Sequence, residues 1–236
     1  KNATNILFFL QTTILSIWSI LNYLTYQVTN LNTALWVERL VLFSAVPNSI
    51  VFLFLMHTFP SKSILMPRKI MWEIIILCAI TMGITLSPFV FSGVRVTPGI
   101  PTPQPVVEIG MILFIIGAVL TIPIGIYFLI KKYRSAQGQE KLQFRYLLLG
   151  VSTMFSLILV FNFIFPTFLQ SSRFIPLSAA FTFPFIAFTA YAIIRHRLLN
   201  VKVIATEILT FLLAVVSLFE VVLSNNIPQL FVRVGT

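Results

Sequence analysis

Residues 111–130 read MILFIIGAVLTIPIGIYFLI, twenty consecutive residues without a charged side chain. An α-helix of about 20 apolar residues crosses the hydrocarbon core of a bilayer, which is about 30 Å thick. This stretch belongs to an apolar run at 107–130, and similar runs occur at 6–26, 35–59, 70–91, 146–169, 174–194 and 203–223. The sequence therefore predicts an all-α protein, a polytopic transmembrane helix bundle with seven spans in this chain.

The composition excludes a soluble globular protein. Of the 236 residues, 58% are hydrophobic and 9% are charged, whereas a soluble domain carries about 25% charged residues. Six carboxylates, all of them Glu, cannot cover a water-exposed surface that must also accommodate 24 Phe residues. Runs such as EIIILCAITMGI do not alternate between apolar and polar residues, so a transmembrane β-barrel is excluded as well.

The net charge of +10 predicts a membrane topology and no nucleic-acid partner, because the basic residues stand in short clusters between the apolar runs. If the loop after the second span is cytoplasmic, twelve of the sixteen Lys and Arg residues fall on that side and three on the other, and Arg39 lies in or near a span. This bias places residue 1 in the cytoplasm and the tail after residue 223 outside.

One ionisable pair stands out near the outer ends of the spans. Glu38 and Arg39 occur in ALWVERLVLF, within about one turn of the start of the second span. Neighbouring helix residues point about 100° apart, so these two are not expected to pair with each other. Either Arg39 extends to the interface beside Trp36, or it pairs with Glu108 at the same end of another span. We predict an intramembrane pair between Arg39 and Glu108.

The sequence contains no set of residues for catalysis or metal binding. His57 and His196 are too far apart in the chain to form a metal motif, and Cys78 lies alone in an apolar run. Gly-rich phosphate loops, nucleophile elbows and HExxH motifs are missing. We therefore expect no cofactor, no metal and no enzymatic activity in this chain.

Prolines inside the predicted spans mark a candidate pocket. A proline frees a helix carbonyl and can kink the helix, and the freed backbone must find another partner. Asparagines lie beside two of these prolines, which favours either a functional pocket or plain helix packing. The residues concerned are Pro47, Asn48, Pro123, Asn162, Pro166 and Pro184.

Three stretches carry a resemblance to a known family. They are TLSPFVFSGVRVTPGIPTP at 85–103, KKYRSAQGQEKLQFRYLLLG at 131–150 and AYAIIRHRLLNVKVIATEILTFLL at 190–213. In their order and spacing they resemble the membrane-embedded N-terminal seven-helix region of bacterial sensor histidine kinases. The resemblance covers nearly the whole chain and is strongest at YAIIRHRLL and EKLQFRYLLLG.

The resemblance implies a domain organisation and a location in the bacterial cytoplasmic (inner) membrane. Residues 1–197 would form the sensor-like bundle of six spans, with one further helix expected before residue 1. Residues 198–236 would form a junction and another transmembrane helix, with one more helix and a kinase core expected beyond. The candidate output junction comprises Arg195, His196, Arg197 and Lys202 at the cytoplasmic surface. The resemblance assigns no ligand-binding residues.

The function expected from these observations is signal sensing: a conformational change in the bundle would pass to a cytoplasmic output through residues 195–202. The alternative is a structural or assembly subunit of a larger membrane complex, without a kinase. A transporter is a weaker alternative, because no carboxylate lies at mid-membrane and no inverted repeat is detectable. The expected partners are the lipid bilayer, an unknown ligand, and either a second copy of the chain or other membrane subunits.

Overall fold

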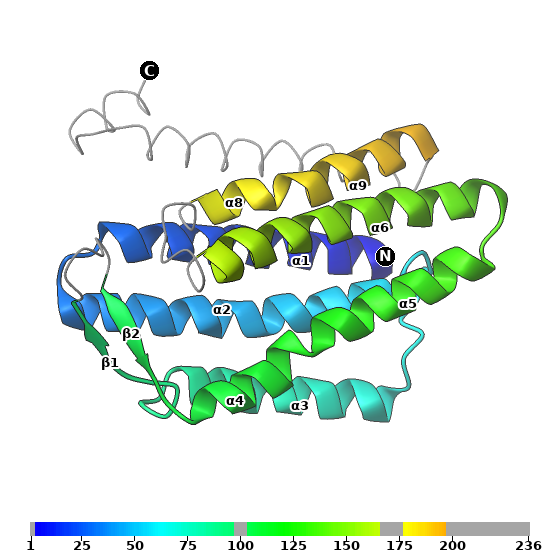
Figure 1. The fold of residues 1–236 in the computed structure, drawn as a ribbon. Coiled ribbons are helices and arrows are strands. Elements are labelled where there is room, and N and C mark those ends of the chain that lie inside the picture. The colour runs from blue at the N-terminus through cyan, green and yellow to red at the C-terminus, as the bar shows by residue number, and fades with distance from the viewer. Residues whose placement is uncertain (1–2, 97–102, 166–176, 197–236) are drawn as a thin grey trace, which may run out of the picture.

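The computed structural model describes residues 3–96, 103–165 and 177–196, and these residues are mostly helical. The long helices lie side by side along a common direction and form a single bundle (Figure 1). Its first three helices are α1 (Ala3–Gln27), α2 (Leu31–Thr58) and α3 (Arg68–Thr85). The later helical segments are α4 (Gly110–Phe114), η1 (Ile115–Val119), α5 (Thr121–Ser135), α6 (Gly138–Leu159), η2 (Val160–Ile164), α8 (Ser178–Phe181) and α9 (Phe183–His196).

Helix α2 occupies the centre of this arrangement. It packs against α1, α3 and α5, and α6 in turn packs against α5 and α9. The tight α1–α2 turn is fixed by Asn30, whose side-chain oxygen accepts hydrogen bonds from the backbone N–H groups of Asn32 and Thr33 at 3.0 and 3.2 Å. Such an N-cap satisfies donors that the first turn of a helix leaves free. The turn therefore sets α1 and α2 side by side as an antiparallel pair.

A two-stranded sheet replaces part of the predicted third span. The predicted helix at 70–91 ends at Thr85, and Phe91 already belongs to strand β1 (Phe91–Arg95). This strand pairs antiparallel with β2 (Gln104–Val107), with a register shift between Phe91 and Gly93. The early end of α3 has a local cause, because Pro88 cannot continue a helix. The Ser87 hydroxyl donates to the carbonyl of Ile84 in the last turn.

Four helices are long and apolar enough to span a membrane within the part of the chain that the structure describes: Ala3–Thr25, Leu31–Thr58, Gly110–Ser135 and Gly138–Leu159. The 18 residues of α3 include Arg68, Lys69 and Glu73, and α3 is not among the four. The predicted fourth and fifth spans are present but extend beyond the predicted limits at 130 and 146. The predicted seventh span at 203–223 lies outside the described residues, so four spans, and not seven, are established.

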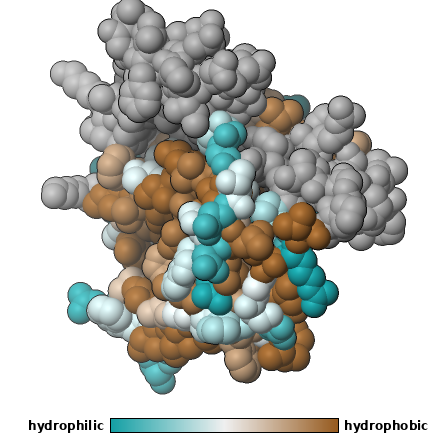
Figure 2. All heavy atoms as spheres, turned by 90° about the vertical axis from the view of Figure 1, so that its left-hand side faces the viewer, coloured by the Kyte–Doolittle hydropathy of each residue, from teal (hydrophilic) through white to brown (hydrophobic). Residues whose placement is uncertain are grey.

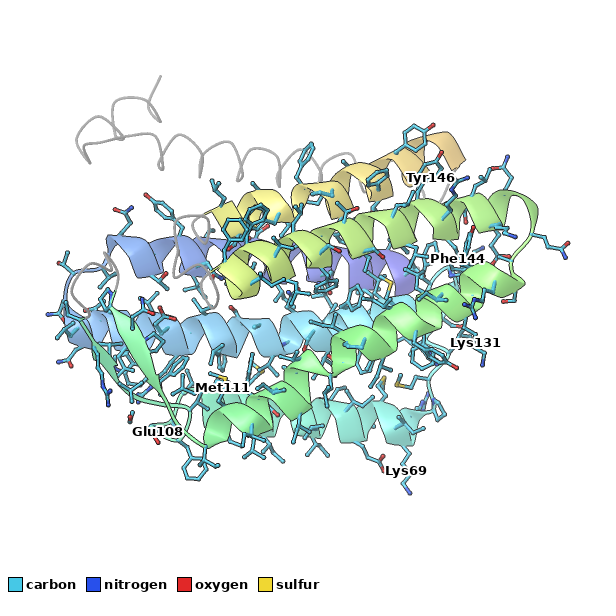
Figure 3. All side chains as sticks on the ribbon, in the orientation of Figure 1. Lys69, Glu108, Met111, Lys131, Phe144 and Tyr146 are labelled. Atoms are coloured by element: carbon cyan, nitrogen blue, oxygen red, sulfur yellow. The ribbon has the colours of Figure 1, made fainter. Side chains whose placement is uncertain are left out.

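The two ends of the bundle differ in charge. The basic end comprises the α2–α3 connection (59–67) and the α5–α6 turn (136–137), and the chain's N-terminus lies there too (Figure 1). Figure 3 places Lys69 and Lys131 at this end and Glu108 at the opposite one. The hairpin end comprises the α1–α2 turn and β1–β2; seen from that side, hydrophilic residues form a central band between hydrophobic flanks (Figure 2).

The outer faces of the helices are apolar. On α3, the side chains of Trp72, Ile76 and Ile80 are 55 to 58% exposed. Inside the bundle, Val46, Met56, Leu129 and Val151 are completely buried. A bundle that is apolar both inside and outside is suited to a surrounding of lipid, and this protein is therefore an integral membrane protein.

Candidate functional site

A cavity of about 130 Å³ lies in the interior of the bundle. Its wall is formed by α1, α2, the α4–η1–α5 segment, α6 and α9. Two amides, Gln11 and Asn48, line it from the middle thirds of α1 and α2, so the cavity lies near mid-span. Apart from these two and Ser49, the described lining residues are apolar.

The two amides face each other across the α1–α2 interface. The Gln11 amide nitrogen donates a hydrogen bond to the Asn48 side-chain oxygen. Gln11 is only 3% exposed, and its own side-chain oxygen is buried without a hydrogen-bond partner. A buried acceptor left unsatisfied costs about 1–3 kcal/mol. The α1–α2 interface beside the cavity therefore contains an amide oxygen that is both buried and unpaired.

One wall of the cavity is a turn of π-helix. In η1, the backbone N–H of Leu120 donates to the carbonyl of Ile115 at 3.1 Å, five residues back. The Thr121 hydroxyl donates to the carbonyl of Ala118 at 2.6 Å. Pro123 has no N–H, so it cannot complete the normal α-helical bond to Val119. Widened turns of this kind occur frequently at functional sites, and here Ala118 and Val119 both line the cavity.

Aromatic contacts hold the opposite walls together. The rings of Phe52 on α2 and Phe155 on α6 meet edge to face, with their centroids 5.5 Å apart. Phe8 on α1 and Phe185 on α9 lie 6.2 Å apart in a tilted contact. Edge-to-face pairs of this kind add about 0.5–1.5 kcal/mol beyond the burial of their area. The cavity is thus bounded by helices whose positions depend on one another.

The structure brings part of the predicted pocket to this cavity. Asn48 lines it directly, whereas Pro47, Pro123 and Pro184 each neighbour a lining residue. Asn162 belongs to η2, where its side chain is not described, and Pro166 lies outside the described residues. Gln11 was not predicted, because its own span contains no proline that would mark it, unlike those of Asn48 and Asn162. The signal available for it was an amide inside the apolar run ILFFLQTTILSIW.

The predicted pair between Arg39 and Glu108 is replaced by other contacts. Arg39 is 6% exposed; its Nη2 donates to the backbone carbonyl of Phe91 at 2.7 Å, and its guanidinium lies 5.2 Å from the centroid of the Trp36 ring. Glu108 is exposed and accepts a hydrogen bond from the Ser92 hydroxyl at 2.6 Å. Both residues therefore bind β1 and not each other, because the unpredicted hairpin supplies nearer partners.

Lys132 has a role that its place in a basic cluster did not indicate. Its ammonium group reaches from α5 to the end of α2 and donates to the carbonyls of Met56 (2.9 Å), His57 and Phe59. The last carbonyls of a helix have no partner within the helix and carry partial negative charge. Lys132 therefore joins α2 to α5 at the basic end.

The predicted output junction is largely outside the described residues. Arg195 and His196 are the last two residues of α9, and nothing is known of their side chains. Arg197 and Lys202 follow beyond the described part. No group of three His, Cys, Asp or Glu residues that could hold a metal ion occurs among the described residues.

The fold defines a class: a polytopic membrane helix bundle, here with a cavity between its helices near mid-span. Residues 1–202 match the family described as the N-terminal 7TM region of histidine kinase, and the chain belongs to that family. This region is the sensory, non-catalytic part of such kinases. Comparison with curated proteins and with solved structures gave no match.

Proposed function

We propose that the chain is the membrane-embedded sensing module of a bacterial sensor histidine kinase, located in the cytoplasmic membrane. Membership of the family supports this function. The clustering of Lys and Arg residues at the basic end supports an orientation with that end in the cytoplasm. The described members of this cluster are Lys62, Arg68, Lys69, Lys131, Lys132, Arg134, Lys141 and Arg145.

The main support for the proposal is that helix α9 begins at the cavity wall and extends to the proposed output junction. Phe185, which is 1% exposed, lines the cavity near the start of this helix, and α9 continues to His196. At 1.5 Å per residue the two positions are about 16 Å apart along the axis. A rearrangement at the cavity wall would therefore be passed along α9 to its end at His196, where the proposed output junction at 195–202 begins.

The packing around α9 favours transmission over local relaxation. A side chain at Gly150 of α6 would place its Cβ 3.1 Å from the Cα of Phe185, so the two helices are in close contact. Closely packed interfaces shift between discrete arrangements and do not deform continuously. A difference of a few kcal/mol between two such arrangements is enough for a signalling switch.

The test uses the full-length product of the gene that encodes this chain. In membrane vesicles incubated with labelled ATP, we expect phosphorylation of a histidine outside the residues of this chain. Inserting four glycines after Asn200 should uncouple the bundle from the kinase and change the phosphorylation level at least severalfold, because a flexible linker does not transmit a displacement. Folding should be intact, as judged by expression and the thermal unfolding midpoint.

A matched control places the same four glycines after Gln137, an exposed residue in the α5–α6 turn. This insertion should leave the phosphorylation level unchanged. If the full-length product carries no phosphohistidine, the sensor-kinase function is refuted and the assembly-subunit alternative is favoured. If both insertions alter phosphorylation equally, the output does not leave through residues 195–202.

A further inference from the structure

An open groove lies on the outer surface of the bundle, where the C-terminal end of α3 packs beside the beginning of α4 (Figure 1). Ile80 and Ile84 of α3 line one side of this groove, and Ile109 and Leu113 line the other. The side chains of Ile80, Ile109 and Leu113 are 55, 63 and 45% exposed. The groove is therefore apolar on both sides and accessible from outside the protein.

Backbone hydrogen bonds fix the hairpin end of the groove. The N–H of Gly110 donates to the carbonyl of Phe89, which also lines the groove, at 2.8 Å. The N–H of Glu108 donates to the carbonyl of Val90 at 2.9 Å. These two bonds hold the segment that follows α3 against the start of α4, so this end of the groove is formed before any occupant arrives.

Glu108 is the one charged residue in the described wall of the groove. It is exposed and accepts a hydrogen bond from the Ser92 hydroxyl, and no Lys or Arg among the described residues forms an ion pair with it. Ser87, the other polar side chain of this wall, is occupied locally, because its hydroxyl donates to the carbonyl of Ile84. Glu108 therefore offers a carboxylate without a basic partner to a cationic group that enters the groove.

The groove extends from the membrane surface into the hydrocarbon region. Glu108 lies two residues before the span Gly110–Ser135, at the hairpin end of the bundle (Figure 3). Leu113 lies inside that span, about 5 Å further along the helix axis than Gly110. The carboxylate is thus at the level of lipid headgroups, and the apolar sides of the groove continue at the level of the acyl chains.

We propose that the groove binds a phospholipid of the surrounding bilayer whose headgroup carries a primary ammonium group, as in phosphatidylethanolamine. An acyl chain lies against Ile80 and Leu113, and the ammonium group donates a charge-assisted hydrogen bond to Glu108. Phosphatidylcholine carries the same charges but has methyl groups in place of the N–H donors, so it forms the weaker contact. This lipid site does not depend on the sensing function proposed above.

The test uses the full chain in lipid nanodiscs. The three tryptophans, Trp18, Trp36 and Trp72, are replaced by Phe. Ile116→Trp then places a single reporter at a position that is 54% exposed and about one turn beyond Leu113. A minor fraction of brominated lipid in phosphatidylcholine quenches this reporter on contact. Brominated phosphatidylethanolamine should bind beside it about threefold more tightly than brominated phosphatidylcholine, as expected for an exposed ion pair.

Two variants separate the carboxylate from the groove itself. Glu108→Gln keeps an acceptor for Ser92 but removes the charge, and should abolish the preference for phosphatidylethanolamine. Gly83→Leu fills the groove and should abolish it too; nothing lies within 4 Å of a Cβ at this position, so the fold has room for the side chain. The matched control, Ala79→Leu, lies on an exposed part of α3 outside the groove lining and should keep the preference.

Each contrary result overturns a definite part of the proposal. Equal quenching by both lipids in the unaltered groove overturns the lipid class. A preference that persists in Glu108→Gln overturns the role of the carboxylate, and one that persists in Gly83→Leu overturns the site. A second copy of the chain is the competing occupant. In a Cys78→Ala background, Gly83→Cys should remain monomeric under oxidation, and a high yield of disulfide-linked dimer would assign the groove to a second copy instead.

Discussion

The two ends of the bundle each hold a cation on backbone carbonyls, the buried Arg39 at one end and the half-buried Lys132 at the other. At the hairpin end, Arg39 donates to one carbonyl, that of Phe91 in a strand, and its Nε is buried without a partner. At the basic end, Lys132 donates to three carbonyls at the C-terminus of α2. Neither cation uses a carboxylate. In a chain with sixteen basic residues and six acidic ones, backbone carbonyls serve as the acceptors for these two cations.

The difference lies in what each contact fixes. A helix C-terminus presents several carbonyls together, and its dipole favours a positive charge there. Lys132 therefore gains more hydrogen bonds than Arg39 and joins two membrane-spanning helices. Arg39 instead joins α2 to a short hairpin at the edge of the bundle. The basic end, close to the proposed output, is accordingly expected to be the more strongly held of the two.

The largest effect should follow from Lys132→Met. The substitution leaves three carbonyls at the end of α2 without their donor, and hydrogen bonds to charged groups contribute about 1.5–3 kcal/mol each. We expect a loss of about 3 kcal/mol in the free energy of unfolding, measured by SDS titration in mixed micelles. The neighbouring exposed Lys131→Met should change it by less than about 0.5 kcal/mol. Similar losses in both variants would contradict the helix-end contact.

A smaller effect is expected at the hairpin end. Arg39→Met removes one charged hydrogen bond and the contact with Trp36, and should lower the free energy of unfolding by about 2 kcal/mol. Glu108→Gln should have almost no effect, because the Ser92 hydroxyl can still donate to the amide oxygen. A double-mutant cycle of the two should give a coupling below about 0.5 kcal/mol. A coupling near 2 kcal/mol would restore the direct ion pair.

The smallest effects concern one glycine at each end. At Gly110, a Cβ would lie 2.5 Å from the backbone oxygen of Phe89, so Gly110→Ala should lower the free energy of unfolding by about 1–2 kcal/mol through the clash. At Gly138, nothing lies within 4 Å but φ is +56°, so Gly138→Ala should lower it by about 1 kcal/mol through backbone strain. Gly83→Ala, in open space on α3, should be neutral or stabilising. Equal values at all three would show that neither constraint operates.

Much of the bundle could be predicted because a membrane span is a local property. The run at 111–130 is apolar over the full thickness of a bilayer, and it does form part of the long helix from Gly110 to Ser135. The limits were less predictable. Helix α6 begins at Gly138 and not at 146, because residues such as Gln, Glu and Lys are good helix formers where no membrane limits the helix.

The sequence by itself determined the class of fold, the membrane location and the family, since these depend on apolar length, charge distribution and order along one chain. Only the tertiary structure decided the partner of Arg39, the helix-end contact of Lys132 and the amide contact between Gln11 and Asn48 beside the cavity. Each of these depends on a backbone carbonyl or a side chain contributed by a distant segment: Phe91 lies 52 residues from Arg39, and Asn48 lies 37 residues from Gln11. Hydrophobic burial in a membrane places helices in the bilayer without specifying their neighbours. The neighbours, and with them the site, follow from packing.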